Sequence, residues 1–467
     1  MRICLDHAYT AKELAVICGG KCTESEISVR YLTTDSREIK AGDLFFALHG
    51  NRDGNHFLAD AAARGAALAL CERREAPLPA VTVPDTGRAL TALASHVREQ
   101  IDPTVIAVTG SVGKTTTKNM IASVLETRFT THKTPGNYNN LLGACLTLLS
   151  MPRETEILVL ELGMNHAGEI QELSRLVRPD IAVITNIGTA HIGNLGSREN
   201  IAAAKLEILQ GCAPDALFLR PCGEPLLHVP KDRAITEVAI GKEKTCACHF
   251  ENLFLRRAET VADYFFDTHY FPALYVAGVG EHIAMCGAFA LAVGCILGIN
   301  EEGIRKGLRA TGTEKMRQEI LTCHGITVIL DCYNASPESV RAALHTLQEM
   351  DTASSHRKCA LLGDMLELGD QTRKLHEAAG EACVAAGVTQ LFTFGAAAEN
   401  IAVGAERCGM KKEAIHHNPN PAAPEISAGQ LSEYLQPGDI LLIKASRALA
   451  AERILMYWAD GHAAGEE

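Results

Sequence analysis

The stretch Thr109-Gly110-Ser111-Val112-Gly113-Lys114-Thr115-Thr116-Thr117-Lys118 decides the fold of this chain. It follows an apolar run at 105–108, which has the length and β-branched content of a buried strand. Residues 119–127 after it predict a helix. A strand, a glycine loop, a Lys-Thr pair and a helix are typical of a phosphate-binding loop. The sequence therefore predicts an α/β domain with a parallel sheet and a nucleotide site.

Each part of this loop contributes to the binding of a phosphate group in such a site. Backbone N–H groups surround the phosphate oxygens, and the helix N-terminus adds partial positive charge. Lys114 reaches the β and γ phosphates, and the Thr115 hydroxyl can bind Mg²⁺. The general pattern has a glycine where this chain has Val108, so we interpret the loop as a compact variant. The ATP-binding candidates here are Gly110, Ser111, Val112, Gly113, Lys114, Thr115 and Thr116.

The composition excludes several classes of protein. A length of 467 residues predicts about three domains, and a net charge of −12 argues against nucleic acid as the main partner. No run approaches the roughly 18–20 apolar residues of a membrane-spanning helix. Asp6 stands where a signal peptide would be apolar. We therefore expect a cytoplasmic protein without membrane insertion.

The 16 cysteines contain no repeated C-x-x-C pair. In a reducing cytosol such scattered cysteines are by default small, buried apolar residues. Cys246, Cys248 and His249 form the densest group of soft metal ligands. They lack a second ligand pair at finger spacing, so a structural zinc site is not predicted.

Residues 1–100 predict a small α/β domain. Strands are expected over 43–48, 67–70 and 80–83, and helices over 57–64 and 85–100. Ahead of the first strand lies the loop Thr33-Thr34-Asp35-Ser36-Arg37. Its hydroxyls, acid and base fit either a site for a polar ligand or ordinary turn chemistry, because Asp and Ser favour turns.

Residues 101–312 predict the nucleotide domain, in which strands end in polar side chains. The strand at 157–160 leads to Glu161, and the strand at 181–184 leads toward His191. Because ligands bind at the carboxyl ends of parallel strands, both side chains are expected near Lys114 and Thr115. Glu161 fits a Mg²⁺ ligand, with a buried salt-bridge partner as the alternative.

Other features of this domain are less specific. A helix is expected from Ser197 to Leu209, and on it periodicity alone predicts Lys205 to be solvated. The amides of Asn137, Asn139 and Asn140 suit a turn, and also suit hydrogen bonds to a peptide or phosphate. Between 215 and 272 only short strands are expected, before an apolar helix that runs to residue 297.

Residues 313–467 predict a third unit of alternating strands and helices. Its strands lead to Asp331, Gly363, Gly395 and Lys444, in a Rossmann-like sheet. The unit lacks the G-x-G-x-x-G fingerprint, so it is not expected to be an ordinary dinucleotide site. Asp331 and Lys444 stand where strand ends would face a cleft.

Long motifs in a fixed order make the prediction specific. They are T-D-S-R (34–37), T-G-S-V-G-K-T-T-T-K (109–118), N-Y-N-N-L-L-G (137–143), E-L-G-M-N-H-A-G-E-I (161–170), I-T-N-I-G-T-A-H-I-G-N-L-G-S (184–197), A-K-L-E-I (204–208), D-C-Y-N-A-S-P-E-S (331–339), L-G-D-M-L-E-L-G (362–369) and K-A-S-R (444–447). This set closely resembles the Mur ligases, over nearly the whole chain.

The resemblance implies a three-domain enzyme. It implies a UDP-sugar domain over 1–100, a central ATPase domain over 101–312 and a mobile C-terminal Rossmann-like domain over 313–467. The chain is most similar to the members that add D-alanyl-D-alanine to UDP-N-acetylmuramoyl-tripeptide, in peptidoglycan precursor synthesis. The implied substrates are these two small molecules, the implied cofactors are ATP and Mg²⁺, and the implied state is a monomer.

The resemblance also implies roles for single residues. Lys205 matches the family's carbamoylated lysine, in which CO₂ turns an ammonium into an anionic oxygen ligand beside Mg²⁺. Glu161 and His191 match metal ligands, and these three with Lys114 form the implied catalytic group. The implied nucleotide contacts of the third domain are Arg317, Asp331 and Asn334. The expected substrate contacts are Asp35, Ser36, Arg37, Asn137, Asn139, Asn140, Lys444, Ser446 and Arg447.

The chain departs from the family pattern in three places. The family has H-N-x-x-N-A where this chain reads His282-Ile283-Ala284-Met285-Cys286-Gly287. The second missing asparagine usually contacts adenine, which leaves adenine recognition open. Ser336 replaces an asparagine and Ala445 replaces a glycine.

The implied reaction forms an amide in two steps, through an acyl phosphate. One alternative is another amino-acid ligase of the same family. The diaminopimelate-adding ligase would carry D-N-P-R, whereas this chain has only N-P-N-P at 418–421. The other alternative is an ATP-binding switch or scaffold without ligase activity.

Overall fold

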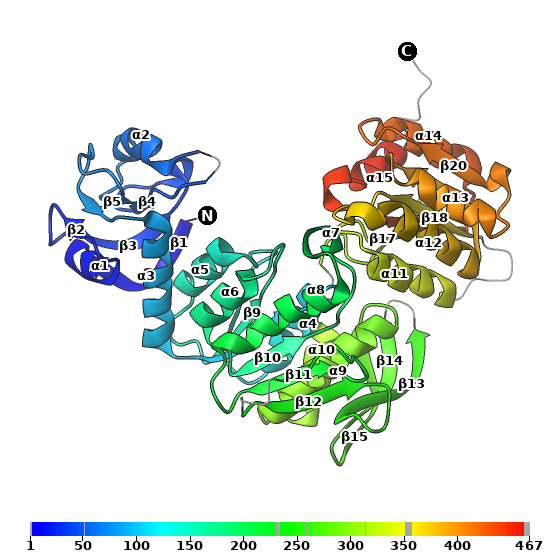
Figure 1. Cartoon of the computed structure of the whole chain (residues 1–467), viewed down its shortest axis with the longest axis horizontal. Coiled ribbons are helices and arrows are strands. Elements are labelled where there is room, and N and C mark those ends of the chain that lie inside the picture. The colour runs from blue at the N-terminus through cyan, green and yellow to red at the C-terminus, as the bar shows by residue number, and fades with distance from the viewer. Residues whose placement is uncertain are drawn as a thin grey trace.

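The computed structural model of the chain describes residues 2–50, 52–229, 234–256, 259–312, 314–350 and 357–461. Over these residues the chain is a mixed α/β protein with three sheets, which confirms the expected fold class (Figure 1). The central sheet lies between the N-terminal sheet and the C-terminal sheet. None of the helices in the described ranges is both long enough and apolar enough to cross a membrane.

The N-terminal sheet has the strand order β1-β3-β4-β5-β6-β2. Its elements are β1 (Arg2–Thr10), α1 (Ala11–Ile17), β2 (Lys21–Cys22), β3 (Ser28–Thr33), β4 (Leu44–Phe46), α2 (Leu58–Ala63), β5 (Leu68–Cys71), β6 (Ala80–Thr82) and α3 (Thr86–Ile101). The sequence predicted the elements from β4 onward, but it did not predict the strands and the helix before β4. Charged and polar residues on the partly exposed faces of β1 and β3 hide their alternation in the sequence.

The central sheet has the order β15-β14-β13-β12-β11-β10-β7-β9-β8. Its strands are β7 (Thr104–Thr109), β8 (Thr131–Lys133), β9 (Ile157–Glu161), β10 (Ile181–Ile184), β11 (Leu217–Pro221), β12 (Thr236–Gly241), β13 (Cys248–Arg256), β14 (Glu259–Phe266) and β15 (His269–Ala277). Strands β13, β14 and β15 pair antiparallel, whereas the others pair parallel. Strands β13 and β14 have 9 and 8 residues, so the expectation of only short strands between 215 and 272 was wrong for this part of the sheet.

The helices of the central part cover both faces of its parallel strands. They are α4 (Lys114–Leu125), α5 (Leu141–Leu149), α6 (Glu169–Val177), α7 (Ile192–Leu195), α8 (Arg198–Leu206), α9 (Glu281–Ile296) and α10 (Glu301–Ala310). Ile106 and Val108 pack in one core with α4 and α9, and Val105 and Ala107 pack in another with α5 and α6. A parallel strand covered on both faces is an apolar run in the sequence, which is why β7 was predictable.

Two helix bounds differ from the expectation. Helix α4 begins at Lys114, five residues earlier than the prediction, because the glycine loop runs directly into its first turn. Helix α8 is capped by Ser197 as expected, but it ends at Leu206 and continues only as a 3₁₀ turn, Glu207–Gly211.

The C-terminal sheet has the order β16-β17-β21-β18-β19-β20, parallel except for the pairing of β16 with β17. Its elements are β16 (Glu319–Cys323), β17 (Ile326–Leu330), α11 (Pro337–Glu349), β18 (Lys358–Gly363), α12 (Thr372–Ala385), β19 (Val388–Phe394), α13 (Glu399–Arg407), β20 (Ile415–Asn418), α14 (Pro424–Tyr434), β21 (Ile440–Lys444) and α15 (Glu452–Ala459). This arrangement confirms the predicted alternation and puts the polar ends of β17 and β21 side by side.

Candidate active site

One large cavity lies between the central and C-terminal parts of the molecule. Its volume is about 1140 Å³. It brings together most of the predicted site residues: Ser111, Val112, Gly113, Lys114, Thr115, Thr116, Asn137, Asn139, Asn140, Glu161, His191, Arg317, Asp331, Asn334, Lys444, Ser446 and Arg447. Gly110 and Lys205 are buried and do not line this cavity.

The phosphate loop joins β7 to α4. A Cβ on Gly110 would lie 1.9 Å from the Oγ1 atom of Thr185, so only glycine fits there. Gly113 has a φ of 80°, a backbone conformation that favours glycine. Nζ of Lys114 donates to the carbonyl of Gly110 at 2.8 Å. Val108 is an inner residue of β7, paired with Glu161 and Val183, which explains the compact form of the loop.

Glu161 is held by two hydrogen bonds at the end of β9. Its Oε2 accepts from Thr115 Oγ1 at 2.7 Å, and its Oε1 accepts from Asn139 Nδ2 at 2.8 Å. The side chain is 2% exposed. A Cβ on Gly163 would lie 2.8 Å from Asn139, so that glycine leaves room for the amide. Asn139, which we expected to bind substrate, is thus bonded to Glu161 in this structure.

The other two amides of this loop differ from Asn139. Asn140 caps α5, since its Oδ1 accepts from the N–H of Gly143 at 2.9 Å. Asn137 is exposed and lines the cavity. Of the three, Asn137 is therefore the side chain that points most freely toward a ligand.

Lys205 is a buried amine with no anionic partner among the residues that the structure describes. Its side chain is 2% exposed, which corrects the solvated lysine that periodicity alone predicted. Within the described part of the chain, it makes no ion pair and donates no side-chain hydrogen bond. Burial lowers the pKa of Lys205 well below its usual value, and the nearby charge of Lys114 adds to that shift. Such a site favours the neutral amine, which is a nucleophile.

His191 precedes α7 and has a φ of 64°, uncommon for a residue other than glycine. Its Nδ1 lies 2.5 Å from Oε2 of Glu367, which belongs to the C-terminal part. Burial lowers the pKa of His191, although the charge of Glu367 opposes this shift. The contact with Glu367 was not predicted, because nothing in the sequence links these positions.

The C-terminal wall of the cavity holds its polar groups through contacts of its own. Lys444 is 2% exposed, and its Nζ donates to Oδ2 of Asp331 at 2.7 Å and to the carbonyl of Asn334 at 3.1 Å. The guanidinium of Arg317 lies over the ring of Tyr333, 3.9 Å from its centre. Lys444, expected as a substrate contact, is thus engaged by the loop after β17.

The remaining members of this wall are also bonded within the C-terminal part. Ser446 is buried, and its hydroxyl accepts from the N–H of Leu366 at 3.0 Å. Arg447 is half exposed and donates to Glu452 at 2.5 Å.

Asp35, Ser36 and Arg37 lie outside this cavity, in the turn after β3. Asp35 accepts hydrogen bonds from the backbone N–H and the guanidinium of Arg37, which lowers the pKa of Asp35 to about 2. The structure therefore supports turn chemistry for Asp35.

One part of the cavity lining consists of apolar side chains. Ile283 and Cys286, in place of the two asparagines, belong to it together with Phe250 and Phe289. Cys286 approaches the phosphate loop, since a Cβ on Gly113 would lie 3.5 Å from its sulfur. Burial raises the pKa of Cys286 to about 11, so this thiol is unreactive at neutral pH.

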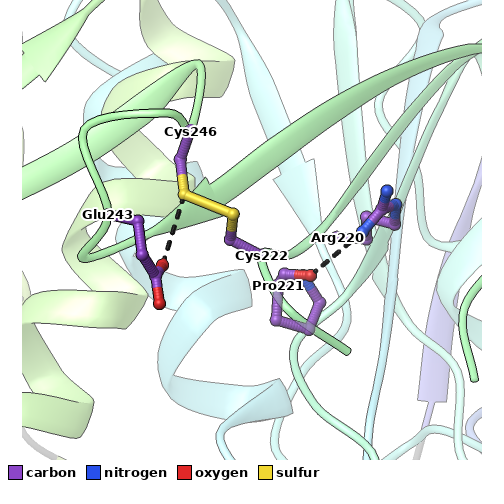
Figure 2. Close-up of a disulfide and its surroundings, with 5 residues drawn as sticks. All are labelled: Arg220, Pro221, Cys222, Glu243 and Cys246. Atoms are coloured by element: carbon purple, nitrogen blue, oxygen red, sulfur yellow. Dashed lines mark hydrogen bonds between the residues drawn. A yellow bond between two sulfur atoms is a disulfide. The ribbon is translucent and has the colours of Figure 1, made fainter. Parts of the chain in front are cut away.

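A disulfide lies beside the cavity, between Cys222 after β11 and Cys246 before β13 (Figure 2). The Sγ of Cys246 also contacts the carboxylate of Glu243 at 3.5 Å. Cys222 and Glu243 line the cavity. This pairing corrects the expectation of free buried cysteines at the two positions. The other two members of the predicted soft cluster point elsewhere: Cys248 donates to the carbonyl of Ala288, and His249 stacks on Phe265.

The fold and the site define a nucleotide-binding α/β protein with a phosphate loop. The family models described as the Mur ligase family catalytic domain, the Mur ligase middle domain, and the Mur ligase glutamate ligase domain match residues 28–98, 108–292 and 316–447. The UDP-N-acetylmuramoyl-tripeptide–D-alanyl-D-alanine ligase of Bacillus subtilis (strain 168) is 36% identical over 468 residues, which cover 96% of this chain and 97% of the relative. The chain belongs to the Mur ligase family.

Solved structures agree with this family. A crystal structure of MurF from Acinetobacter baumannii has a TM-score of 0.89 at 29% identity, over 98% of this chain and 100% of that one. MurF ligase from Thermotoga maritima in complex with ADP has a TM-score of 0.81 at 29% identity, over 92% of this chain and 97% of that one.

Proposed function

We propose that this chain is an ATP-dependent ligase that joins D-alanyl-D-alanine to UDP-N-acetylmuramoyl-tripeptide. The observation that carries the proposal is the single cavity in which a phosphate loop, Glu161 and His191 face Arg317 and Asn334 of the C-terminal part. Relatives that carry this activity in their names align over nearly the full length of both chains.

The reaction needs a good leaving group on a carboxylate. The terminal carboxylate of the tripeptide attacks the γ-phosphorus of ATP, which releases ADP and leaves an acyl phosphate. The amine of the dipeptide then attacks the acyl carbon, loses a proton, and expels inorganic phosphate. Since a phosphoryl transfer needs positioning and charge neutralisation more than covalent help, Lys114 and the loop N–H groups are suited to the first step.

The residues present fit a Mg²⁺ ion beside the phosphates. Mg²⁺ prefers hard oxygen ligands, and the Thr115 hydroxyl and the Glu161 carboxylate lie 2.7 Å apart at the start of α4. His191 lines the same cavity and supplies a ring nitrogen. When bound, the ion would neutralise charge on the transferred phosphoryl group. Thr115, Glu161 and His191 would hold it.

Lys205 fits a carbamate. A buried ammonium without a counter-ion is unfavourable, whereas a neutral amine can add to CO₂ with loss of one proton. The product would be an anion beside the positive charge of Lys114, which already influences Lys205. The carbamate would supply a further anionic oxygen ligand at the metal end of the site.

The proposal assigns the substrates to two sides of the molecule. The N-terminal part, 1–100, would bind the UDP sugar through Asp35, Ser36 and Arg37, and the parts at 101–312 and 313–467 would bind ATP and the peptide. Asn137 and Arg447 are exposed, line the cavity and would contact the peptide. Because one chain provides the whole cavity, a monomer suffices. ATP and a nucleotide-linked sugar are cytoplasmic metabolites, so the reaction would occur there.

The experiment that tests the proposal measures phosphate release from ATP in the presence of the UDP-tripeptide, with and without D-alanyl-D-alanine. We expect phosphate release to depend on the dipeptide and to match the amide product mole for mole by mass spectrometry. Phosphate release that ignores the dipeptide would mean an ATPase or a nucleotide-dependent switch instead.

A further inference from the structure

Two carboxylates of the C-terminal part contact the loop that carries His191. Glu338, at the start of α11, accepts hydrogen bonds from the N–H and the hydroxyl of Thr189, both at 2.8 Å. Glu367 places Oε2 2.5 Å from Nδ1 of His191, and its carbonyl accepts from the N–H of Gly193 at 2.9 Å. We call residues 188–193, with Glu338 and 367–369 opposite them, the docking contact.

The two sides of the docking contact fit closely. A Cβ on Gly188 would lie 2.6 Å from the carboxyl carbon of Glu338, and a Cβ on Gly193 would lie 2.7 Å from the carbonyl oxygen of Glu367. Gly193 is not among the glycines with a left-handed φ. Glycine is therefore required at 193 because a side chain would clash with Glu367, and not because of the backbone conformation. Helix α7, which follows His191, contacts the 3₁₀ turn Gly369–Gln371 of the C-terminal part.

The residues that meet here share an unusual backbone. His191 and Glu367 both have a φ of 64°, in the left-handed region that side chains other than glycine rarely adopt. Such residues persist where the surroundings hold them, and they gather at functional sites. Here two residues with this backbone conformation face each other across the boundary between the two parts. We interpret this contact as functional, and not only as packing.

We propose that Glu367 and Glu338 are positioning residues, through which docking of the C-terminal part sets the orientation of His191. The inference rests on the proposed function, because His191 has its metal role only there. A carboxylate in contact with Nδ1 restricts the ring of His191 and leaves Nε2 for another partner. Glu367 fixes the ring, and Glu338 fixes the backbone two residues earlier, through Thr189.

This arrangement links two events that the reaction needs at the same time, the closing of the cavity and the fixing of the His191 ring. The same C-terminal part carries Asn334 and Arg447 into the cavity. When it docks, these side chains reach the cavity and the ring of His191 is fixed in one movement. When it is undocked, His191 has no Glu367 to hold its ring. The central part alone then lacks a fixed His191. Phosphoryl transfer from ATP therefore does not begin before the facing wall is in place.

The first test removes the carboxylates. Glu367→Ala and Glu338→Ala should each lower kcat about 10- to 100-fold, with little change in the KM for ATP. Glu367→Gln and Glu338→Gln keep an accepting oxygen and should recover most of that loss. Glu413→Gln, an exposed carboxylate elsewhere in the C-terminal part, is the matched control and should behave as wild type. Wild-type kcat in both Ala variants would overturn the proposal, and so would Gln variants as slow as the Ala variants.

The second test leaves every polar group in place. Gly193→Ala inserts one methyl group into the docking contact, and should increase the radius of gyration measured by X-ray scattering in buffer without metal or nucleotide. Gly429→Ala is the control, because no atom lies within 4 Å of a Cβ built there. An unchanged radius of gyration together with wild-type kcat in Gly193→Ala would contradict the proposal. If Gly193→Ala does not fold, the Glu367 and Glu338 variants decide.

The two proposals fail in different ways. If the wild-type protein forms no amide, the proposed function is wrong, while scattering of Gly193→Ala still decides whether the docking contact holds the parts together. If the wild-type protein is an active ligase and the Glu variants are unaffected, only the positioning role is wrong.

Discussion

The two walls of the cavity hold their polar groups in different ways. On the central wall, Glu161 collects hydrogen bonds from Thr115 and Asn139, which come from α4 and from the loop before α5. On the C-terminal wall, Lys444 and Asp331 form an ion pair at the ends of β21 and β17. Within each wall, these particular groups are held by neighbours from the same part of the chain. The central wall therefore offers a carboxylate and a hydroxyl at the place we propose for Mg²⁺, whereas on the C-terminal wall a buried lysine holds the loop after β17.

Lys205 does not line the cavity but is buried within the influence of Lys114, and its replacement should have the largest effect. Lys205→Ala should lower kcat by about 10³-fold or more, because it would remove the proposed carbamate and with it one oxygen ligand of the metal ion. A ¹³C NMR signal from labelled bicarbonate should be present in the wild-type protein and lost in the variant. Added bicarbonate should not restore activity. Full activity in the variant would exclude a role for this lysine.

Replacing the acid of the central wall should come next. Glu161→Gln keeps the shape and one acceptor but removes the charge, and we expect kcat to fall about 10²- to 10³-fold. The dependence on Mg²⁺ concentration should shift to higher values in steady-state assays. A variant with unchanged Mg²⁺ dependence would contradict the assignment of Glu161 as a ligand.

The ion pair of the C-terminal wall should affect stability more than chemistry. Lys444→Met removes one partner of a buried pair and should lower the free energy of unfolding of the C-terminal part by about 3 kcal/mol. Hydrogen exchange of the amides in β17 and β21 would measure this locally. Unchanged protection with a large rise in the KM for a substrate would instead support the substrate contact that the sequence predicted.

Replacing the amides before α5 should have the smallest effects. These variants test how the central wall holds its polar groups. Asn139→Ala should lower kcat about 10- to 100-fold with little change in KM, because it acts through Glu161. Asn137→Ala, at an exposed position, should raise the KM for the UDP-tripeptide and leave kcat close to wild type. If the two variants exchange these effects in steady-state assays, the roles drawn from the hydrogen bonds are wrong.

Much of the central wall could be predicted from the sequence, because parallel strands bring their carboxyl ends to one edge. That rule alone puts Glu161 near Thr115, although 46 residues separate them. Lys205 could not be predicted as buried, because helical periodicity does not show what covers a helix. The resemblance to the Mur ligases supplied its role.

Other parts could not be predicted, because they depend on partners far along the chain. Glu367 lies 176 residues after His191, and their contact forms only when two separate sheets dock. Cys222 and Cys246 meet because β11, β12 and β13 are neighbours in the sheet, which no cysteine spacing reveals. Strands β13, β14 and β15 contain register shifts and the left-handed residues Asn252 and Ala273, which break the alternation that marks a strand.

The position of β7 in its sheet has a consequence for synthesis. The N-terminal sheet is complete once Thr82 has been made, so it can fold while translation continues. Strand β7 lies between β9 and β10, and the face with Ile106 and Val108 is covered by α9. The ribosome must therefore reach Ile296 before this strand is fully enclosed. Until then, an apolar strand with unpaired edges is exposed on the nascent chain. We expect a chaperone to bind most strongly at this stretch of the chain.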